Sequence, residues 1–332
     1  MQHAPHSRRR LAGVALAALL ALGAGAAEAK ALKFGWTTPD APADPYAITA
    51  REFKKNVEAA TNGQVEIQLF PNRQLGDEKE MMEGIRFGTI DAGVITNAVL
   101  ANVEKALQVN DLPFLYANAE QAHRVLDGPL GQDLMKLLEP KGLIGLGFCE
   151  GGFRNMINNV RPVDEPEDVK GVKYRVMQNP VYIGMFSSLG GNAVPMAWGE
   201  VFPAVQQGAL DGLEVPLMVI NSTKMYEVTK YLSLTNHTYS AILLLVSKKS
   251  FDRLTSEQQQ AVRAAGQATC IEQRRQNAAN EAKTMEELKA KGMQINMIKD
   301  PAAFRAMVRP VYDEFRPNIG EKRLDAFLEA VK

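Results

Sequence analysis

Gly171-Val-Lys-Tyr-Arg175-Val-Met-Gln178 begins the stretch of sequence that decides the fold, and Gly208-Ala-Leu-Asp211-Gly212 ends it. Every second residue of its first part is apolar, which is the period of a β-strand. If that apolar set faces a core, Arg175 points to the opposite side. A helix-like run and a second short strand then lead to Trp198, and a fixed guanidinium beside an indole could receive a carboxylate with an apolar body. The alternative is a solvated arginine, because most arginines are exposed.

The corner that ends this stretch has a counterpart earlier in the chain. Gly88-Thr-Ile-Asp-Ala-Gly-Val94 matches Gly208-Ala-Leu-Asp-Gly-Leu-Glu214, and each copy follows a helical pattern and leads into a strand. A chance match is the alternative, because the motif is short. Strands that alternate with helices indicate an α/β protein with a largely parallel sheet. The repeat favours two similar α/β lobes with a ligand cleft between them.

Several elements can be placed from their patterns. We predict strands at 32–36, 65–70, 94–95, 143–148 and 241–246, helices after Asp44 and Asp77 and over 221–231, and two helices within 301–332. A helical pattern without proline also runs from a capping box at Ser256 to Gly292. At 1.5 Å per residue it would be roughly 54 Å long, so we expect it to span both lobes. A kink near Gly266 is the competing possibility.

The N-terminus is typical of an export signal. Arg8-Arg-Arg10 precede an apolar run to about Leu22, and Ala27-Glu-Ala29 provides a cleavage site. We predict a signal peptide at 1–29, cleaved near Ala29, and an exported protein, with an uncleaved anchor as the alternative. General and twin-arginine export both stay open.

The Gly151-Gly152 pair is a plausible crossing between lobes. We assign residues 30–152 plus 241–280 to lobe 1 and residues 153–240 plus 281–332 to lobe 2.

The charge balance argues against a nucleic-acid partner. The chain has 38 basic and 38 acidic residues, and cleavage would remove three arginines and one glutamate, leaving a net charge of −2. A nucleic-acid surface would require a basic excess. Hydrophobic residues make up 46% of the chain and charged residues 23%, as in soluble globular proteins.

Catalytic and metal-binding patterns are scarce. After cleavage the chain retains His123 and His237, and neither has the spaced partner that a zinc site needs. The sequence contains no G-x-S-x-G elbow and no phosphate-binding loop, so we predict no enzyme, no cofactor and no metal. The pair Asp77-Glu78 is interpreted as a solvated helix surface. Cys149 and Cys270 could form one bridge, but two buried free thiols are favoured, because they lie in an apolar strand and a distant helix.

These residues together resemble a known family. The sequence is similar to the solute-binding proteins of the tripartite ATP-independent periplasmic (TRAP) transporters, of the C4-dicarboxylate-binding DctP type. The matching segments cover nearly the whole mature chain in order: Lys33-Phe-Gly-Trp36, Phe70-Pro-Asn-Arg-Gln-Leu-Gly-Asp77, Gly88-Thr-Ile-Asp91, Lys170-Gly-Val-Lys-Tyr-Arg175, Pro195-Met-Ala-Trp-Gly-Glu200, Gly208-Ala-Leu-Asp-Gly212 and Tyr226-Glu-Val-Thr-Lys-Tyr-Leu through to His237.

The resemblance implies a periplasmic protein with the two-lobed periplasmic-binding-protein fold, and a binding site in the cleft between its lobes. It assigns the carboxylate clamp to Arg175, an assisting role to Arg154 and an aromatic wall to Trp198. First-lobe residues would close over the ligand, namely Trp36, Thr37, Gln74, Asp77, Thr96 and Asn97. Near the clamp it also implies Gln178, Glu214 and Val215, and this chain departs from the family pattern by carrying valine at 215, where many members carry asparagine.

The implied function is capture of a small organic acid for transport. The ligand would be a mono- or dicarboxylate, a 2-oxo or hydroxy acid, or a sugar acid, and the sequence leaves the choice open. The resemblance implies TRAP integral membrane subunits as partners, and we expect a monomer. The competing functions are an exported enzyme acting on a carboxylate substrate and a ligand-sensing module for a receptor.

Overall fold

The computed structural model describes residues 29–332, so the predicted signal peptide lies outside the described residues except for Ala29. The strands are β1 (Lys30–Gly35), β2 (Val65–Phe70), β3 (Ala92–Thr96), β4 (Leu143–Asn158), β5 (Lys173–Val176), β6 (Asn192–Pro195), β7 (Gly212–Pro216), β8 (Tyr231–Ser247) and β9 (Gln294–Met297). The α-helices are α1 (Pro45–Ala60), α2 (Glu78–Phe87), α3 (Asn97–Leu100), α4 (Ala119–Asp127), α5 (Pro129–Lys136), α6 (Pro180–Ser188), α7 (Trp198–Gln206), α8 (Leu217–Ser222), α9 (Lys248–Phe251), α10 (Ser256–Ala290), α11 (Pro301–Ile319) and α12 (Glu321–Ala330).

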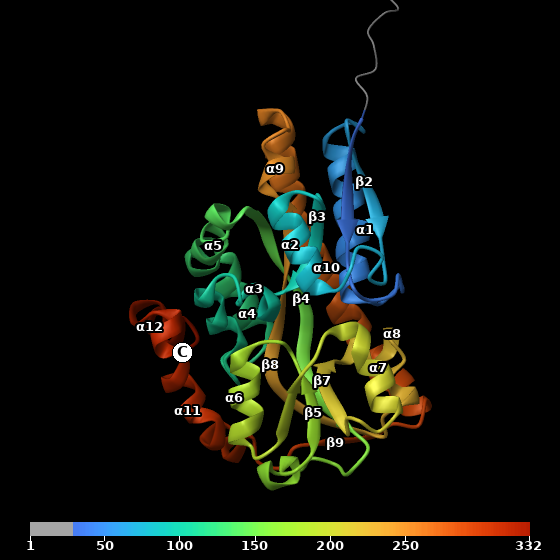
Figure 1. Ribbon diagram of the computed structural model, residues 1–332, viewed down its shortest axis with the longest axis vertical. Helices are drawn as coiled ribbons and strands as arrows, with labels where there is room; N and C mark the ends of the chain where they lie inside the picture. Colours follow the sequence, from blue (N-terminus) through green and yellow to red (C-terminus); the bar gives the residue numbers. More distant parts are fainter. Residues whose placement is uncertain (1–28) are drawn as a thin grey trace, which may run out of the picture.

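The sheet has the strand order β2-β1-β3-β8-β4-β7-β5-β6, with β9 paired to β8. Parallel pairing of β1 with β2 and β3 builds a first lobe with α1–α3, and parallel pairing of β5 with β6 and β7 builds a second lobe with α6–α8. The long strands β4 and β8 run antiparallel through both lobes (Figure 1). The two-lobed α/β fold is therefore confirmed. The sheet is parallel only within each lobe, because β3 meets β8 and β7 meets β4 in antiparallel register. The residue boundaries of the lobes stay predictions.

Strand β8 explains the continuous apolar run from Ala241 to Val246. Alternate residues of this run pack into two different hydrophobic clusters, so the strand is buried on both faces. The predicted strand is confirmed, but β8 begins ten residues earlier.

The helix predicted over 221–231 is wrong in extent, because α8 ends at Ser222 and Lys224 adopts a left-handed φ of 57°. A single turn at Met225–Glu227 follows before β8 starts.

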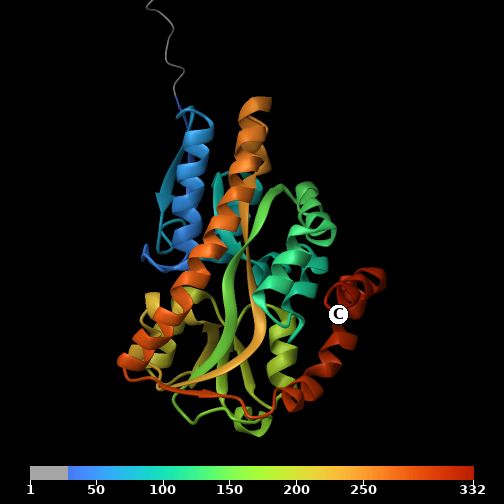
Figure 2. The same cartoon turned by 180° about the vertical axis from the view of Figure 1, so that it is seen from behind.

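The longest helix, α10, connects the two lobes along the back of the molecule (Figure 2). Its 35 residues continue without interruption past Gly266, so the predicted long helix is confirmed and the competing kink is not present. The helix begins with a capping box between Thr255 and Gln258. A Cβ at Gly266 would lie 2.5 Å from Cβ of Leu146 on β4. Glycine is therefore needed here because helix and strand approach closely, and not because the backbone bends.

A disulfide bond joins Cys149 on β4 to Cys270 on α10. The prediction of two free thiols is therefore wrong. The cysteines are 121 positions apart in sequence, yet their Cα atoms lie only 4.5 Å apart. The sequence showed an apolar strand and a helix, but it did not show that α10 packs directly on β4.

The two helices predicted in the C-terminal tail are α11 and α12. The hydroxyl of Tyr312 on α11 donates to the carbonyl of Pro113 at 2.8 Å, and the side chain of Gln121 on α4 donates to the carbonyl of Val331 at 2.7 Å. The tail is thus tied to two separate segments of the chain. Within residues 29–332, none of the helices combines the length and the apolar composition needed to span a bilayer.

Candidate ligand-binding site

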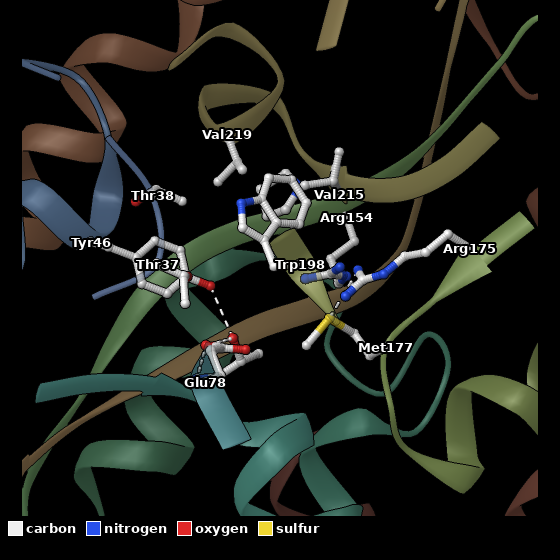
Figure 3. A pocket seen from close by; sticks show the side chains of 12 residues that line it. Thr37, Thr38, Tyr46, Glu78, Arg154, Arg175, Met177, Trp198, Val215 and Val219 are labelled. Atoms are coloured by element: carbon white, nitrogen blue, oxygen red, sulfur yellow. Dashed lines mark hydrogen bonds between the residues drawn. The ribbon is translucent and has the colours of Figure 1, made fainter. Parts of the chain in front are cut away.

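A cavity lies between the lobes, with an empty space of about 340 Å³ that includes the solvent at its mouth. The residues that line it are Thr37, Thr38, Tyr46, Glu78, Thr96, Arg154, Arg175, Met177, Trp198, Val215, Pro216 and Val219. Figure 3 shows the side chains of both arginines directed toward the same space.

Arg175 is a buried cation on β5, and only 2% of its surface is exposed. Its Nε donates to the carbonyl of Met196 at 2.9 Å, its Nη1 lies 3.4 Å from Sδ of Met177, and its Cζ lies 5.7 Å from the ring centre of Trp198. Burial lowers the pKa of Arg175 to about 10, so the side chain is charged at neutral pH. Within residues 29–332 no carboxylate forms an ion pair with it.

Arg154 on β4 is equally buried, but its charge is neutralised within the protein. It forms an ion pair with the carboxylate of Glu214, donates to the main-chain carbonyl of Glu214 at 2.8 Å, and donates to Oγ of Ser240 at 3.1 Å. Burial alone would lower the pKa of Arg154, but the charge of Glu214 raises it. Burial would raise the pKa of Glu214, but the charge of Arg154 and the contacts with His237 and Arg154 together lower it. Arg154 therefore has far less unsatisfied charge than Arg175.

The first-lobe wall of the cavity is polar. Oε1 of Glu78 accepts hydrogen bonds from the backbone N–H of Thr96 at 2.8 Å and from its hydroxyl at 2.5 Å. The hydroxyl of Tyr46 lies 3.0 Å from Oγ1 of Thr96. Burial raises the pKa of Glu78. The interpretation of Asp77-Glu78 as a solvated pair is wrong for Glu78, because only 8% of its surface is exposed.

The structure brings six of the predicted site residues together around the cavity, namely Thr37, Thr96, Arg154, Arg175, Trp198 and Val215. Two more, Asp77 and Gln178, line a smaller adjoining space that Arg175 and Trp198 also border. Asp77 precedes α2 but makes no side-chain cap there. Its Oδ2 instead accepts the backbone N–H of Gly199 at 3.0 Å, which links the first lobe to the second.

Four predicted residues lie outside the cavity lining. Trp36 is fully buried in a hydrophobic cluster, and Gln74 is exposed in the turn after β2. Asn97 is buried and donates to the carbonyl of Leu107 at 2.9 Å. Glu214 is buried as the partner of Arg154.

Sequence reasoning missed three prominent cavity residues, namely Tyr46, Glu78 and Met177. Met177 is two positions after Arg175 and so falls on the same face of the strand pattern. Its position could therefore have been found from the same period of two. Tyr46 and Glu78 lie at the starts of the helices predicted after Asp44 and Asp77, and no local pattern shows that these helix starts face a cavity. Within residues 29–332 no group of three or more His, Cys, Asp or Glu side chains could hold a metal ion.

Comparison with known proteins identifies the family. A family model described as "Bacterial extracellular solute-binding protein, family 7" matches residues 37–318. The chain belongs to this family. The family 7 protein is 40% identical over 279 residues to a solute-binding protein of Verminephrobacter eiseniae, and the match covers 84% of this chain and 83% of the relative. It is 35% identical to the 2,3-diketo-L-gulonate-binding periplasmic protein YiaO of Escherichia coli, over 90% of this chain and 91% of the relative.

A solved family structure agrees with the fold. The TRAP periplasmic solute-binding protein of Polaromonas sp. JS666, bound to D-erythronate, has a TM-score of 0.87 and 38% identity, covering 90% of this chain and 98% of that one. The resemblance to TRAP solute-binding proteins is therefore confirmed. Because the family and its solved neighbours are solute-binding proteins, the chain is a binding protein and not an enzyme.

Proposed function

We propose that this family 7 protein is the periplasmic component of a TRAP transporter and that it captures a small organic acid through Arg175. The observation that carries the proposal is a buried positive charge that faces a cavity without an ion-pair partner in residues 29–332. An isolated buried charge is costly, and an anionic ligand would remove that cost. The names of the relatives support an acid, since one binds D-erythronate and one binds 2,3-diketo-L-gulonate.

The geometry of a guanidinium suits a carboxylate. Its planar fork can donate two parallel hydrogen bonds to the two carboxylate oxygens, which an ammonium group does not match. Nε of Arg175 is already used by the carbonyl of Met196, so the Nη groups face the ligand. Trp198 and Val215 supply apolar surface beside this fork. Arg154, whose charge is balanced by Glu214, adds a second guanidinium to the same space.

Closure of the lobes would hold the acid. Hydrogen bonds already join the lobes around the cavity: Gly199 N–H to Asp77 at 3.0 Å, Asn102 Nδ2 to the carbonyl of Gln178 at 2.9 Å, and Ser222 Oγ to Asp44 at 2.6 Å. A closed cavity excludes water and strengthens the arginine–carboxylate attraction. The closed protein, as a monomer, would then dock on the membrane subunits of the transporter and release the acid.

The test is calorimetric binding of D-erythronate and of erythritol, which has a similar chain of hydroxyls but no carboxylate. We expect D-erythronate to bind and erythritol not to bind. In Arg175→Lys the affinity for D-erythronate should fall at least about 30-fold, because the ammonium cannot make both hydrogen bonds of the fork and a lost hydrogen bond to a charged group costs roughly 1.5–3 kcal/mol. Arg161→Lys, a partly buried arginine of the second lobe outside the cavity, is the matched control. Equal affinity in wild type and Arg175→Lys would overturn the assignment of Arg175.

A second measurement tests transport. Membrane vesicles that contain the TRAP integral membrane subunits should take up the bound acid only when this protein is added. Uptake at the same rate without the protein would contradict its proposed role in delivery.

A further inference from the structure

Glu78 is the only acidic residue that lines the cavity in the described part of the chain. It enters the cavity from the first turn of α2, and 8% of its surface is exposed. No lysine, arginine or histidine within residues 29–332 forms an ion pair with it. Both hydrogen bonds from Thr96 go to Oε1, so Oε2 has no donor from the described residues. A buried carboxylate oxygen is thus free to accept a hydrogen bond from a ligand.

The hydroxyls of Thr96, Tyr46 and Thr38 direct their protons away from the cavity, along hydrogen bonds that end at a carboxylate. A carboxylate only accepts hydrogen bonds, so the hydroxyl of Thr96 gives its proton to Glu78. The contact between Tyr46 and Thr96 must then run from the tyrosine hydroxyl to Oγ1 of Thr96. Thr38 likewise gives its proton to Asp44 at 2.6 Å. These three hydroxyls therefore offer lone pairs to the cavity, and Thr37 is the exception that keeps its proton free.

The two walls of the cavity consequently differ in chemistry. The second-lobe wall and the crossing strand supply the cationic donors Arg175 and Arg154, whereas the first-lobe wall supplies mainly acceptors around Glu78. A ligand that satisfies both walls carries one carboxylate for the arginines and hydroxyl donors for the acceptors. A second carboxylate at the hydroxyl end would place acceptors against acceptors and one negative charge against another. Juxtaposed like charges are a recognised means of rejecting a wrong ligand.

We propose that Glu78 is a specificity-determining residue, which makes this protein a receptor for hydroxylated monocarboxylates and excludes dicarboxylates. This inference rests on the proposed function, because it takes one carboxylate to be held at Arg175. It narrows the ligand from organic acids in general to acids of the sugar-acid type, with a carboxylate at one end and hydroxyls along the chain. D-erythronate and 2,3-diketo-L-gulonate, the ligands named for two relatives, both have this pattern.

The decisive comparison uses two pairs of ligands, and the members of each pair differ at one carbon. Oxidation of the terminal CH₂OH of D-erythronate to a carboxylate gives meso-tartrate, and the same change converts D-galactonate to galactarate. Calorimetry at pH 7.5 should give affinities at least about 100-fold higher for each monocarboxylate than for its matched dicarboxylate, since a like-charge contact costs several kcal/mol. Equal affinities within a pair would overturn the inference.

Glu78→Gln tests the residue itself. The amide keeps an oxygen for Thr96 but removes the negative charge, so the preference for the monocarboxylate should fall at least about tenfold. Glu80→Gln, on the exposed face of the same helix, should keep the wild-type preference. A preference that is unchanged in Glu78→Gln overturns the role of Glu78. If both acids of a pair bind equally and both depend on Arg175, this inference fails and the proposed function stands, whereas binding of neither series by folded wild-type protein overturns both.

Discussion

Two arginines of the same cavity differ in what surrounds them. Arg154 and Arg175 are each 2% exposed, yet Arg154 has the carboxylate of Glu214 as its partner and Arg175 has a main-chain carbonyl, a thioether sulfur and the face of an indole. Burial therefore lowers the pKa of Arg175, whereas the ion pair raises that of Arg154. Only Arg175 therefore needs a negative charge from outside the described residues.

Asp111 allows the effect of a buried carboxyl group on folding stability to be tested without a ligand. Burial, the largest cause, raises its pKa from 3.8 to about 7 in the folded protein, and its carboxylate accepts from Nδ2 of Asn179 at 2.9 Å. Between these two pKa values the folded state binds more protons than the unfolded state, so this group stabilises the fold as pH falls. From pH 8 to pH 5 the wild type should gain stability relative to Asp111→Asn, by at most about 1.4 kcal/mol per pH unit.

Urea unfolding at several pH values measures this difference. Asp133→Asn, which removes an exposed carboxylate paired with Lys136, serves as the control and should follow the wild type. Parallel pH profiles for wild type and Asp111→Asn would show that the carboxylate of Asp111 is not held in its neutral form by the fold.

The position of Arg175 at the cavity could be predicted from the sequence, but the burial of Glu78 could not. The alternation around Arg175 fixes which side of the strand it faces, and this is a property of the local pattern. Glu78 is a charged residue in the first turn of a helix, a position that normally faces solvent. Its burial depends on the contact between that helix and Thr96 at the end of β3, and a contact between distant segments leaves no periodic signal.

At the scale of elements, the fold is organised by β4, β8 and α10. The two strands carry the chain through both lobes, and α10 packs across β4 at Leu146, Gly147 and Cys149. The sequence located the first part of β4, ending it at Phe148, and the last part of β8, beginning it at Ala241. The missing portions contain two buried polar residues: Arg154, which forms an ion pair with Glu214, and His237, whose Nε2 lies 3.5 Å from Oε2 of Glu214. Binary patterns of apolar and polar residues therefore underestimate both strands.

The disulfide between β4 and α10 should contribute strongly to stability. It closes a loop between positions 121 residues apart, and constraining a loop of this length in the unfolded chain is worth about 4–5 kcal/mol in the loop-entropy model. We expect the double variant Cys149→Ala/Cys270→Ala to lose about 2–5 kcal/mol of unfolding free energy.

Chemical denaturation with and without a thiol reductant tests this expectation. The wild type should lose stability when reduced, and the double variant should be insensitive to the reductant. A wild type whose unfolding curve is the same under oxidising and reducing conditions would contradict the contribution assigned to the bond.

At the scale of the whole molecule, two lobes enclose a cavity with a cationic side and an acceptor side. The prediction of two lobes came from a short repeated corner and from the alternation of strands and helices, and the family 7 match and the solved neighbour agree with it. What the sequence did not indicate is how the lobes meet. Hydrogen bonds such as Gly199 N–H to Asp77 join residues more than a hundred positions apart, and only the folded chain brings them together.

The central claim is that a carboxylate binds at Arg175. The most direct measurement is a crystal structure of the protein in complex with D-erythronate. We predict the carboxylate in the cavity between the lobes, with both of its oxygens within about 3 Å of the guanidinium nitrogens of Arg175 and its hydroxyls directed toward Glu78. A carboxylate bound away from Arg175, with the guanidinium still unpaired, would contradict the account.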